Sequence, residues 1–430
     1  MSAKGAKAPL PIIPTAVLPG LVDIVRMDDP PDSQRVFLFQ DATTAGSIES
    51  KEKGELLVPA GKDDAGWLPP RHGAVLAAYN ALKRGTLTTE TLFRQVRNKL
   101  ESYCHLPDPA LYDVLSAWVI HTYRMDWWQR TPIVMLYGPP DTGKNQIGGV
   151  MTYLSYRGED HGMLTAANVF RGAQLLHSML FFDVSRLNIV LRKEGLDDVL
   201  IKRTQKEGTV RRVIDPSLAN LGGQRTFRPW GSTIIATNEV PASDAILSRA
   251  LFIPTEAVDT HYAIPTPEEL GGLQEQLVAW RWLTLAGNIK PDPEVQGQGV
   301  KRWRQMTRPI QQITKLLAPS RLEVVEKGLT YFRSAQKQVR SQGDIADVLA
   351  AVVDAVAKNS QTPGRVATAD LLQTYRDATG DDRAPIKRIS SHLHALGLKP
   401  GAKLEGGSKR GWSYDPAALK RRTRELGLEE

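Results

Sequence analysis

The stretch that decides the fold is PIVMLYGPPDTGKN, residues 132–145. Its first half is a continuous apolar run, typical of a buried strand, and its second half matches G-x-x-x-x-G-K at the start of a helical segment. Glycines let successive backbone N–H groups turn inward around a phosphate, and the helix N-terminus adds its positive dipole end. The predicted phosphate-binding residues are Gly138, Pro139, Pro140, Asp141, Thr142, Gly143, Lys144 and Asn145. From the pattern alone, a Gly/Pro turn with an exposed lysine stays open as the alternative.

Asn145 stands where a serine or threonine hydroxyl is expected to hold Mg²⁺. An amide oxygen can also ligate Mg²⁺ or hold one of its waters. A second apolar run, SMLFFDV (residues 178–184), ends in Asp183, at the place where P-loop ATPases carry the acid that organises Mg²⁺. Asn145 and Asp183 are therefore the predicted metal ligands, with a helix N-cap as the other interpretation of Asp183.

The residue after Asp183 is Val184, where hydrolysing members of this class usually carry a glutamate that polarises the attacking water. Either the water is activated from elsewhere, or hydrolysis is slow or absent.

A third apolar run, STIIATNE (residues 232–239), delivers Asn238 at its end, where an amide can orient water near the γ-phosphate. Arg249 follows a short helical stretch and precedes a further apolar run. It suits an arginine that acts on a neighbouring subunit's nucleotide, or else a surface salt bridge. Apolar runs separated by helical segments predict an α/β layer fold with a parallel sheet.

Composition limits the class of protein. The 430 residues suit two or three domains, and 41% hydrophobic against 24% charged residues allows a packed core. Cys104 is the only cysteine, so an intrachain disulfide and a cysteine zinc site are excluded. No apolar run is long enough to span a bilayer, and the N-terminus lacks the apolar core of a signal peptide. We expect a cytoplasmic protein without a membrane partner, in a bacterial host or encoded by a phage.

Four stretches resemble the AAA+ ATPases, and within them the helicase-like ATPases of phages and integrated mobile elements. They are LPDPALYDVLSAWVIHTY (106–123), TPIVMLYGPPDTGKN (131–145), LTAANVFRGAQLLHSMLFFDV (164–184) and IIATNEVPASDAILSRALFIP (234–254). The resemblance implies that the loop and Asp183 are the Walker A and Walker B motifs, that Asn238 is sensor 1, and that Arg249 is the arginine finger. It also implies a ring, usually a hexamer, with ATP between subunits and DNA or RNA in the pore. KRWRQMTRPIQQITKLL (301–317) resembles the lid helices, where Arg304 or Arg308 is a candidate second sensor.

Two basic regions are candidate nucleic-acid contacts. In helicase-type rings, the insertion between the second and third apolar runs faces the pore, and here it carries KRTQKEGTVRRVID. Its predicted contacts are Lys202, Arg203, Lys206, Arg211 and Arg212, which would neutralise backbone phosphates of a single strand. A solvated loop is the alternative.

The second basic region lies near the end of the chain, where residues 383–424 hold eleven lysines and arginines against two acids. It resembles a winged-helix domain. APIKRISSHLHALGL (384–398) would be the recognition helix and KLEGGSKRGWSY (403–414) the wing, with Lys387, Arg388, Lys409 and Arg410 facing duplex DNA. Winged helices also dock proteins, which is the alternative.

These observations predict four regions: residues 1–102 with strands and then helices, a 103–265 ATPase core, a 266–360 helical lid and linker, and a 361–430 winged helix. The favoured function is an ATP- and Mg²⁺-dependent DNA helicase or translocase of mobile-element replication, acting as a homo-oligomer. Two rivals remain. One is an ATP-binding initiator or loader with weak or absent hydrolysis, favoured by Asn145 and Val184. The other is a transcription-regulatory DNA binder with a vestigial ATPase core.

Overall fold

The computed structural model describes residues 10–27, 34–50, 52–213, 223–358, 364–380, 384–403 and 410–425. The chain divides into two compact units, residues 1–335 and residues 336–430. The boundaries expected after residues 102 and 265 fall inside the first unit. Helix α11 (Leu322–Lys358) runs from the first unit into the second.

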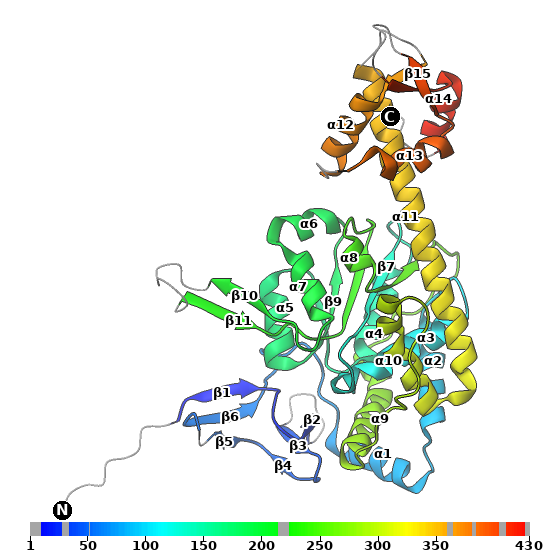
Figure 1. Cartoon of the computed structure of the whole chain (residues 1–430). Helices are drawn as coiled ribbons and strands as arrows, with labels where there is room; N and C mark the ends of the chain where they lie inside the picture. The colour runs from blue at the N-terminus through cyan, green and yellow to red at the C-terminus, as the bar shows by residue number, and fades with distance from the viewer. Residues whose placement is uncertain are drawn as a thin grey trace, which may run out of the picture. The chain divides into compact units, whose positions relative to one another are not determined.

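A five-stranded sheet forms the centre of the first unit (Figure 1). Its strands are β7 (Ile133–Tyr137), β8 (Gly158–His161), β9 (Met179–Asp183), β12 (Thr233–Thr237) and β13 (Ala250–Pro254), in the order β13-β7-β12-β9-β8. Every neighbouring pair is parallel. Strands β7, β9, β12 and β13 are almost wholly buried, which explains their continuous apolar sequences and confirms the predicted α/β fold. Strand β8 was not predicted, because this edge strand has the polar sequence GEDH.

Helices cover both faces of the sheet (Figure 1). One face carries α1 (His72–Arg84), α2 (Thr89–Tyr103), α3 (Ala110–Thr122), α4 (Lys144–Leu154), α9 (Pro267–Ala286) and α10 (Lys301–Leu317). The other carries α5 (Ala166–Arg171), α6 (Leu187–Glu194), α7 (Leu196–Arg203) and α8 (Asp244–Leu247). Alternate residues of each strand face the two layers; Val134, Phe181 and Ile234, for example, join the core with α2, α3 and α9. Helix α3 is buried around its whole circumference, as its apolar sequence requires.

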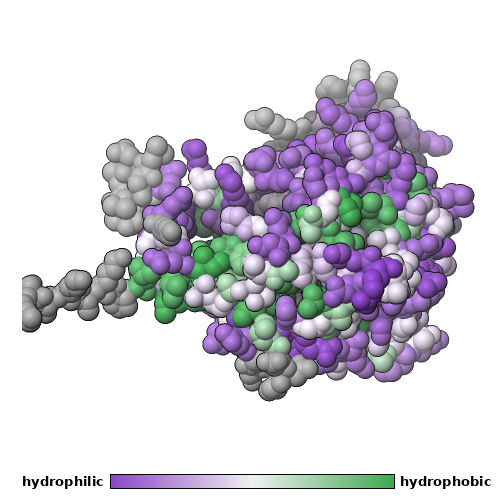
Figure 2. Space-filling view, turned by 90° about the horizontal axis from the view of Figure 1, so that it is seen from below, coloured by the Kyte–Doolittle hydropathy of each residue, from purple (hydrophilic) through white to green (hydrophobic). Residues whose placement is uncertain are grey.

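The N-terminal residues form two small sheets, β1-β6-β5 and β2-β3-β4. Their strands are β1 (Ile12–Thr15), β2 (Leu21–Arg26), β3 (Arg35–Phe39), β4 (Thr44–Ala45), β5 (Ile48–Ser50) and β6 (Glu55–Pro59). A buried ion pair joins them to the core, with Arg157 Nε 2.7 Å from Asp23 Oδ1. Arg157 Nη1 also donates to the carbonyls of Ala16 and Leu176, so this buried charge is paired and hydrogen-bonded through Nε and Nη1. Apolar residues gather on the outer surface of β1-β6-β5, where Ile12 is 64% exposed (Figure 2).

The second unit combines the end of α11 with β14 (Arg365–Ala367), α12 (Thr368–Thr379), α13 (Ile386–Ala395), β15 (Lys399–Lys403), β16 (Arg410–Ser413) and α14 (Pro416–Glu425). Its sheet has the order β14-β16-β15 with antiparallel pairs, and Leu371, Leu393 and Trp412 share its core. Helix α13 and the β15–β16 pair lie where the recognition helix and the wing were predicted, whereas β14 and α14 were not predicted. Lys409 lies outside the described residues, as do the side chains of Arg388 and Arg410.

None of the helices in the described part of the chain is long and apolar enough to cross a membrane.

Burial of His121 predicts an acid-sensitive fold. This side chain, in α3, has no exposed surface, and burial lowers the pKa of His121 from 6.5 to about 4. Between these values the unfolded chain binds a proton that the folded chain does not, so the free energy of unfolding decreases as pH falls from 6.5 toward 4. His121→Phe keeps a ring between Trp118 and Trp128 and removes the titrating group. Thermal melts at pH 7 and pH 5 should show a smaller decrease in Tm for this variant. His72→Phe, at a partly exposed position, is the control, and equal decreases for wild type and His121→Phe would contradict the assignment.

Candidate functional site

The predicted phosphate-binding loop connects the carboxyl end of β7 to the N-terminus of α4. Two of its residues have left-handed backbone, Asp141 with φ 63° and Gly143 with φ 77°. Gly138 is held tightly: its N–H donates to Thr237 O at 3.2 Å, and a Cβ here would meet Thr255 Oγ1 and lie 2.6 Å from Thr255 O. Glycine at this position therefore allows the loop to cross close to its neighbouring strands.

Lys144 is folded back onto its own loop. Its Nζ donates to Gly138 O at 2.7 Å and to Pro139 O, and it lies 3.3 Å from Thr142 Oγ1. Only 7% of this residue is exposed, and burial lowers the pKa of Lys144 although the charges of Asp183 and Asp141 oppose the shift. A triphosphate would replace two neutral carbonyls with anionic oxygens, so the lysine has a reason to turn toward it.

Asn145 and Asp183 are in direct contact. Asn145 Nδ2 donates to Asp183 Oδ2 at 2.7 Å, which links the first turn of α4 to the end of β9. Both residues line a cavity of about 480 Å³ together with the loop, Gln146, Ser185 and Asn238. The end of β12 lies between the ends of β7 and β9, so the loop, Asn238 and Asp183 come from three neighbouring strands.

The oxygen atoms around this cavity fit a common way in which proteins coordinate Mg²⁺ together with a nucleotide. Mg²⁺ takes one or two protein oxygens, several waters and the phosphates of its nucleotide. Asp183 offers a carboxylate at the cavity, and Asn145 offers an amide oxygen once the amide turns around, since its nitrogen now faces Asp183. Within the described residues there is no group of three or more His, Cys, Asp or Glu that could hold a metal without a nucleotide.

Position 184 cannot carry a water-activating group in this backbone. Val184 is 5% exposed, and its N–H donates to Ala236 O at 2.8 Å, so its side chain belongs to the core and not to the cavity. Glu239 follows Asn238 directly, yet its Oε2 accepts a hydrogen bond from the Asn188 N–H at 2.9 Å, in the first turn of α6. This carboxylate is thus used as a helix cap.

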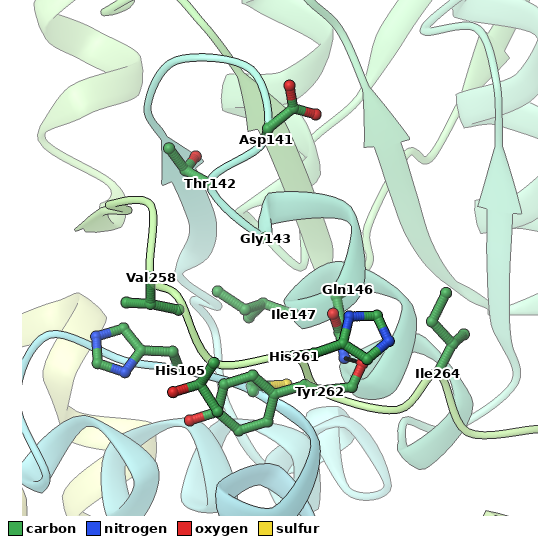
Figure 3. A pocket seen from close by; sticks show the side chains of 12 residues that line it. His105, Asp141, Thr142, Gly143, Gln146, Ile147, Val258, His261, Tyr262 and Ile264 are labelled. Atoms are coloured by element: carbon green, nitrogen blue, oxygen red, sulfur yellow. Dashed lines mark hydrogen bonds between the residues drawn. The ribbon is translucent and has the colours of Figure 1, made fainter.

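A smaller pocket of about 180 Å³ adjoins the loop and was not predicted (Figure 3). His105 and Tyr262 line one side, and Asp141, Thr142 and Gly143 line the other. Gln146 Nε2 stabilises its wall by donating to the carbonyls of Tyr103, Tyr262 and Ala263. The pocket escaped prediction because residues 255–265 have neither strand nor helix periodicity. Its chemistry, aromatic and histidine rings beside a phosphate loop, suits a flat nucleobase.

Arg249 directly precedes β13, so it lies at the amino end of this strand, away from the cavity at the carboxyl ends. Its Nη1 donates to Ala245 O, and the residue is 7% exposed in the isolated chain. Burial, and then the charges of Arg302 and Arg130, lower the pKa of Arg249 to about 10, so the guanidinium stays charged at neutral pH. Action on a neighbouring subunit's nucleotide requires that the side chain leave Ala245 O.

The basic insertion contains a hairpin of β10 (Val210–Val213) and β11 (Gln224–Phe227). Arg211 and Lys202 are exposed, Arg212 is partly exposed, and Lys206 Nζ donates to Asp126 O at 2.7 Å. The prediction for Arg203 is wrong. This residue is 1% exposed, and its guanidinium donates to Thr233 Oγ1 and to the carbonyls of Ser178, Pro229 and Ser232. It is a structural side chain that fastens α7 to the sheet.

The predicted recognition helix is α13. It buries Ile389 and Leu393 and leaves Lys387 exposed. Of the candidate second sensors, Arg304 donates to Gly299 O at 3.2 Å, and Arg308 lines a separate cavity.

Comparisons with known proteins give weak likenesses only. No family model and no curated protein matches the chain. Among solved structures, the apo A form of the NrS-1 C-terminal region aligns over 86% of this chain and 83% of that chain, at 14% identity and a TM-score of 0.34. The JCV helicase bound to an acetamide ligand aligns over 62% and 68%, at 14% identity and 0.27. Drosophila ORC bound to DNA aligns over 78% and 92%, at 10% identity and 0.19. All three of these TM-scores are below 0.5, and the identities are 14% or less.

The tight packing of Gly138 yields a test of the loop. Gly138→Ala should lower the free energy of unfolding by about 2 kcal/mol, because the added methyl group overpacks against Thr255. Gly149→Ala, in the interior of α4, is the matched control: nothing lies within 4 Å of its Cβ position, so it should raise stability by about 0.5 to 1 kcal/mol. Chemical denaturation measures both, and equal effects would contradict the loop geometry.

Proposed function

We propose that this chain is an AAA+ ATPase that binds ATP at the loop and acts on DNA as a helicase or translocase, in the replication of a phage or mobile element. One observation carries the proposal. The loop, Asp183 and Asn238 end three neighbouring parallel strands and line one cavity of about 480 Å³, with a second pocket of base size beside it. Ligands of open α/β sheets bind at the carboxyl ends of the strands, which is where both cavities lie.

The roles follow from the contacts. The N-terminus of α4 and the loop N–H groups bind the phosphates, and Lys144 leaves Gly138 O to contact the outer ones. Bound Mg²⁺ would be held by Asp183 and Asn145 and would supply charge neutralisation at the phosphates. Asn238 is placed at the cavity to orient water, and His105 and Tyr262 face the base.

Assembly into a ring, a hexamer by resemblance, would bring Arg249 of one subunit to the nucleotide of the next. The exposed Arg211 and Lys202 of the insertion, with its partly exposed Arg212, suit contacts to phosphates of a single strand. The strand–helix–helix–hairpin order of the second unit supports a winged helix for duplex DNA, with Lys387 on its exposed face.

A second function is favoured by two features, of which the first is the hydrogen bond from Asn145 to Asp183. It occupies the carboxylate that should meet the metal, and the buried Val184 supplies no base. Both features favour an initiator or loader in which ATP serves assembly and is hydrolysed slowly.

Nucleotide binding and turnover separate the two functions. Lys144→Ala should lower ATP turnover about 100-fold, because the phosphates lose their cation. Lys202→Ala, which removes an exposed lysine, should leave turnover in the absence of DNA unchanged.

A wild-type chain that binds ATP yet shows no turnover, with or without single-stranded DNA, would exclude the helicase or translocase and leave the initiator or loader. In that case Asn145→Thr, which frees Asp183 and restores a hydroxyl, should bring turnover from undetectable to measurable. A glutamate at position 184 is not added in this test, because Val184 is buried and the change would bury a carboxylate.

The assignment of Arg249 is tested by mixing two inactive chains. Arg249→Ala should bind ATP and fail to turn it over, and Lys144→Ala should fail to bind it. A mixed oligomer contains sites with Lys144 from one chain and Arg249 from the other, so mixing should restore part of the turnover. If Arg249 acts only within its own subunit or only in folding, the mixture stays inactive.

A further inference from the structure

A large basic cavity lies near the amino end of β7. The two proposed nucleotide cavities lie at the carboxyl ends of the strands. The basic cavity has a volume of about 770 Å³, within the usual range for ligand sites. Its walls are the segment of residues 124–130 that leads into β7, the loop after α9, and one face of α10. Because β7 has five residues and spans about 17 Å, the loop at its carboxyl end and this cavity at its amino end take separate ligands.

The lining of this cavity is strongly cationic. It holds Arg124, Arg130, Lys290 and Arg308 against a single carboxylate, Asp126. That carboxylate is already shared, with Arg124 Nη2 at 2.9 Å and Arg281 Nη1 at 3.9 Å. The cavity therefore keeps a surplus of positive charge that its own residues do not neutralise.

Several N–H groups of these arginines lack acceptors. Arg124 Nη1, Arg130 Nη1 and Arg308 Nε are buried and have no hydrogen-bond partner within the described part of the chain. Buried donors without partners are rare, and each costs free energy unless a water or ligand satisfies it. Burial and then the charge of Arg302 lower the pKa of Arg130, which shows that further positive charge lies close by.

The basic insertion reaches the same place. Lys206 N–H donates to Gln129 O at 3.2 Å, and Lys206 Nζ donates to Asp126 O at 2.7 Å. Both acceptors belong to residues that line the cavity. The exposed Arg211 and the rim of the cavity are thus joined through one short stretch of chain.

We propose that this cavity is a second phosphate-binding site, in which Arg130, Lys290 and Arg308 contact the oxygens of a phosphate chain other than the chain's own bound nucleotide. Guanidinium groups present paired N–H donors that match phosphate oxygens, and the absence of a free carboxylate in the lining fits a polyanion. The phosphates come from a nucleic-acid strand or from a polyphosphate such as the nucleotide of a second copy. The site does not depend on ATP binding at Lys144.

The test uses the full chain with Lys144→Ala, so that the loop does not compete. Lys290→Glu/Arg308→Glu is compared with Lys301→Glu, an exposed lysine on the same helix α10 that does not line the cavity. One probe is inorganic tripolyphosphate, measured by calorimetry, and the other is a fluorescein-labelled oligothymidylate, measured by anisotropy over a range of salt. If a nucleic-acid strand is the source, the double variant binds the oligonucleotide about tenfold more weakly, with a salt slope smaller by about 2.

Loss of tripolyphosphate binding with unchanged oligonucleotide binding would support the site and identify a nucleotide or polyphosphate as the source. Unchanged binding of both probes, relative to Lys301→Glu, would overturn the proposal. Lys290→Glu alone keeps the comparison valid if the double variant does not fold, because Lys290 is exposed on a loop. Loss of ATP binding in Lys144→Ala tests the loop separately, so the two proposals fail independently.

Discussion

Strand β12 hydrogen-bonds to β7 on one side and to β9 on the other, and the candidate site depends on this placement. Parallel strands end at the same edge of a sheet, so the loop after Tyr137, Asn238 and Asp183 meet although about a hundred residues separate the first two. The register is fixed by burial: each strand places alternate apolar residues into two different helical layers, and a slip of one residue would exchange the layers. The geometry of the cavity therefore follows from the apolar core and not from contacts between the polar residues.

The polar contacts within the cavity then decide its chemistry. Lys144 bonded to Gly138 O, and Asn145 bonded to Asp183, satisfy each group in the absence of a nucleotide. The first contact is exchanged at little cost, because a neutral carbonyl gives way to an anionic phosphate. The second ties up the carboxylate that would hold the metal, and an amide must turn before it offers oxygen. Under the proposed function, phosphate binding and hydrolysis would therefore be separable, because the contact between Asn145 and Asp183 affects only the metal ligand.

The sequence predicted what has a regular local pattern. The apolar strands and the loop between β7 and α4 were found from the apolar runs and the glycine spacing, and helix α13 lies within the predicted residues 384–398. Strand β8 was missed because an edge strand need not be apolar, and the base pocket was missed because its walls come from irregular loops. Arg203 was misassigned for a different reason: charge in a basic stretch indicates exposure only on average, and here four oxygens satisfy the buried guanidinium.

Burying Arg203 also shapes its neighbours. The arginine fixes the end of α7 to Thr233 and to the carbonyl of Ser178, and the chain leaves this anchor toward Lys206, which closes against Gln129. The segment that leads into the β10–β11 hairpin is therefore held by the contacts of Arg203 and Lys206, beside the amino end of β7. Arg130 and Arg249 precede β7 and β13 at their amino ends, and like charges gather there although they repel one another. This repulsion between positive charges opposes folding, whereas an anion bound at the amino ends of the strands would reduce it. The two proposed sites thus lie at opposite ends of the same parallel strands, with a nucleotide at the carboxyl ends and phosphates of another molecule at the amino ends.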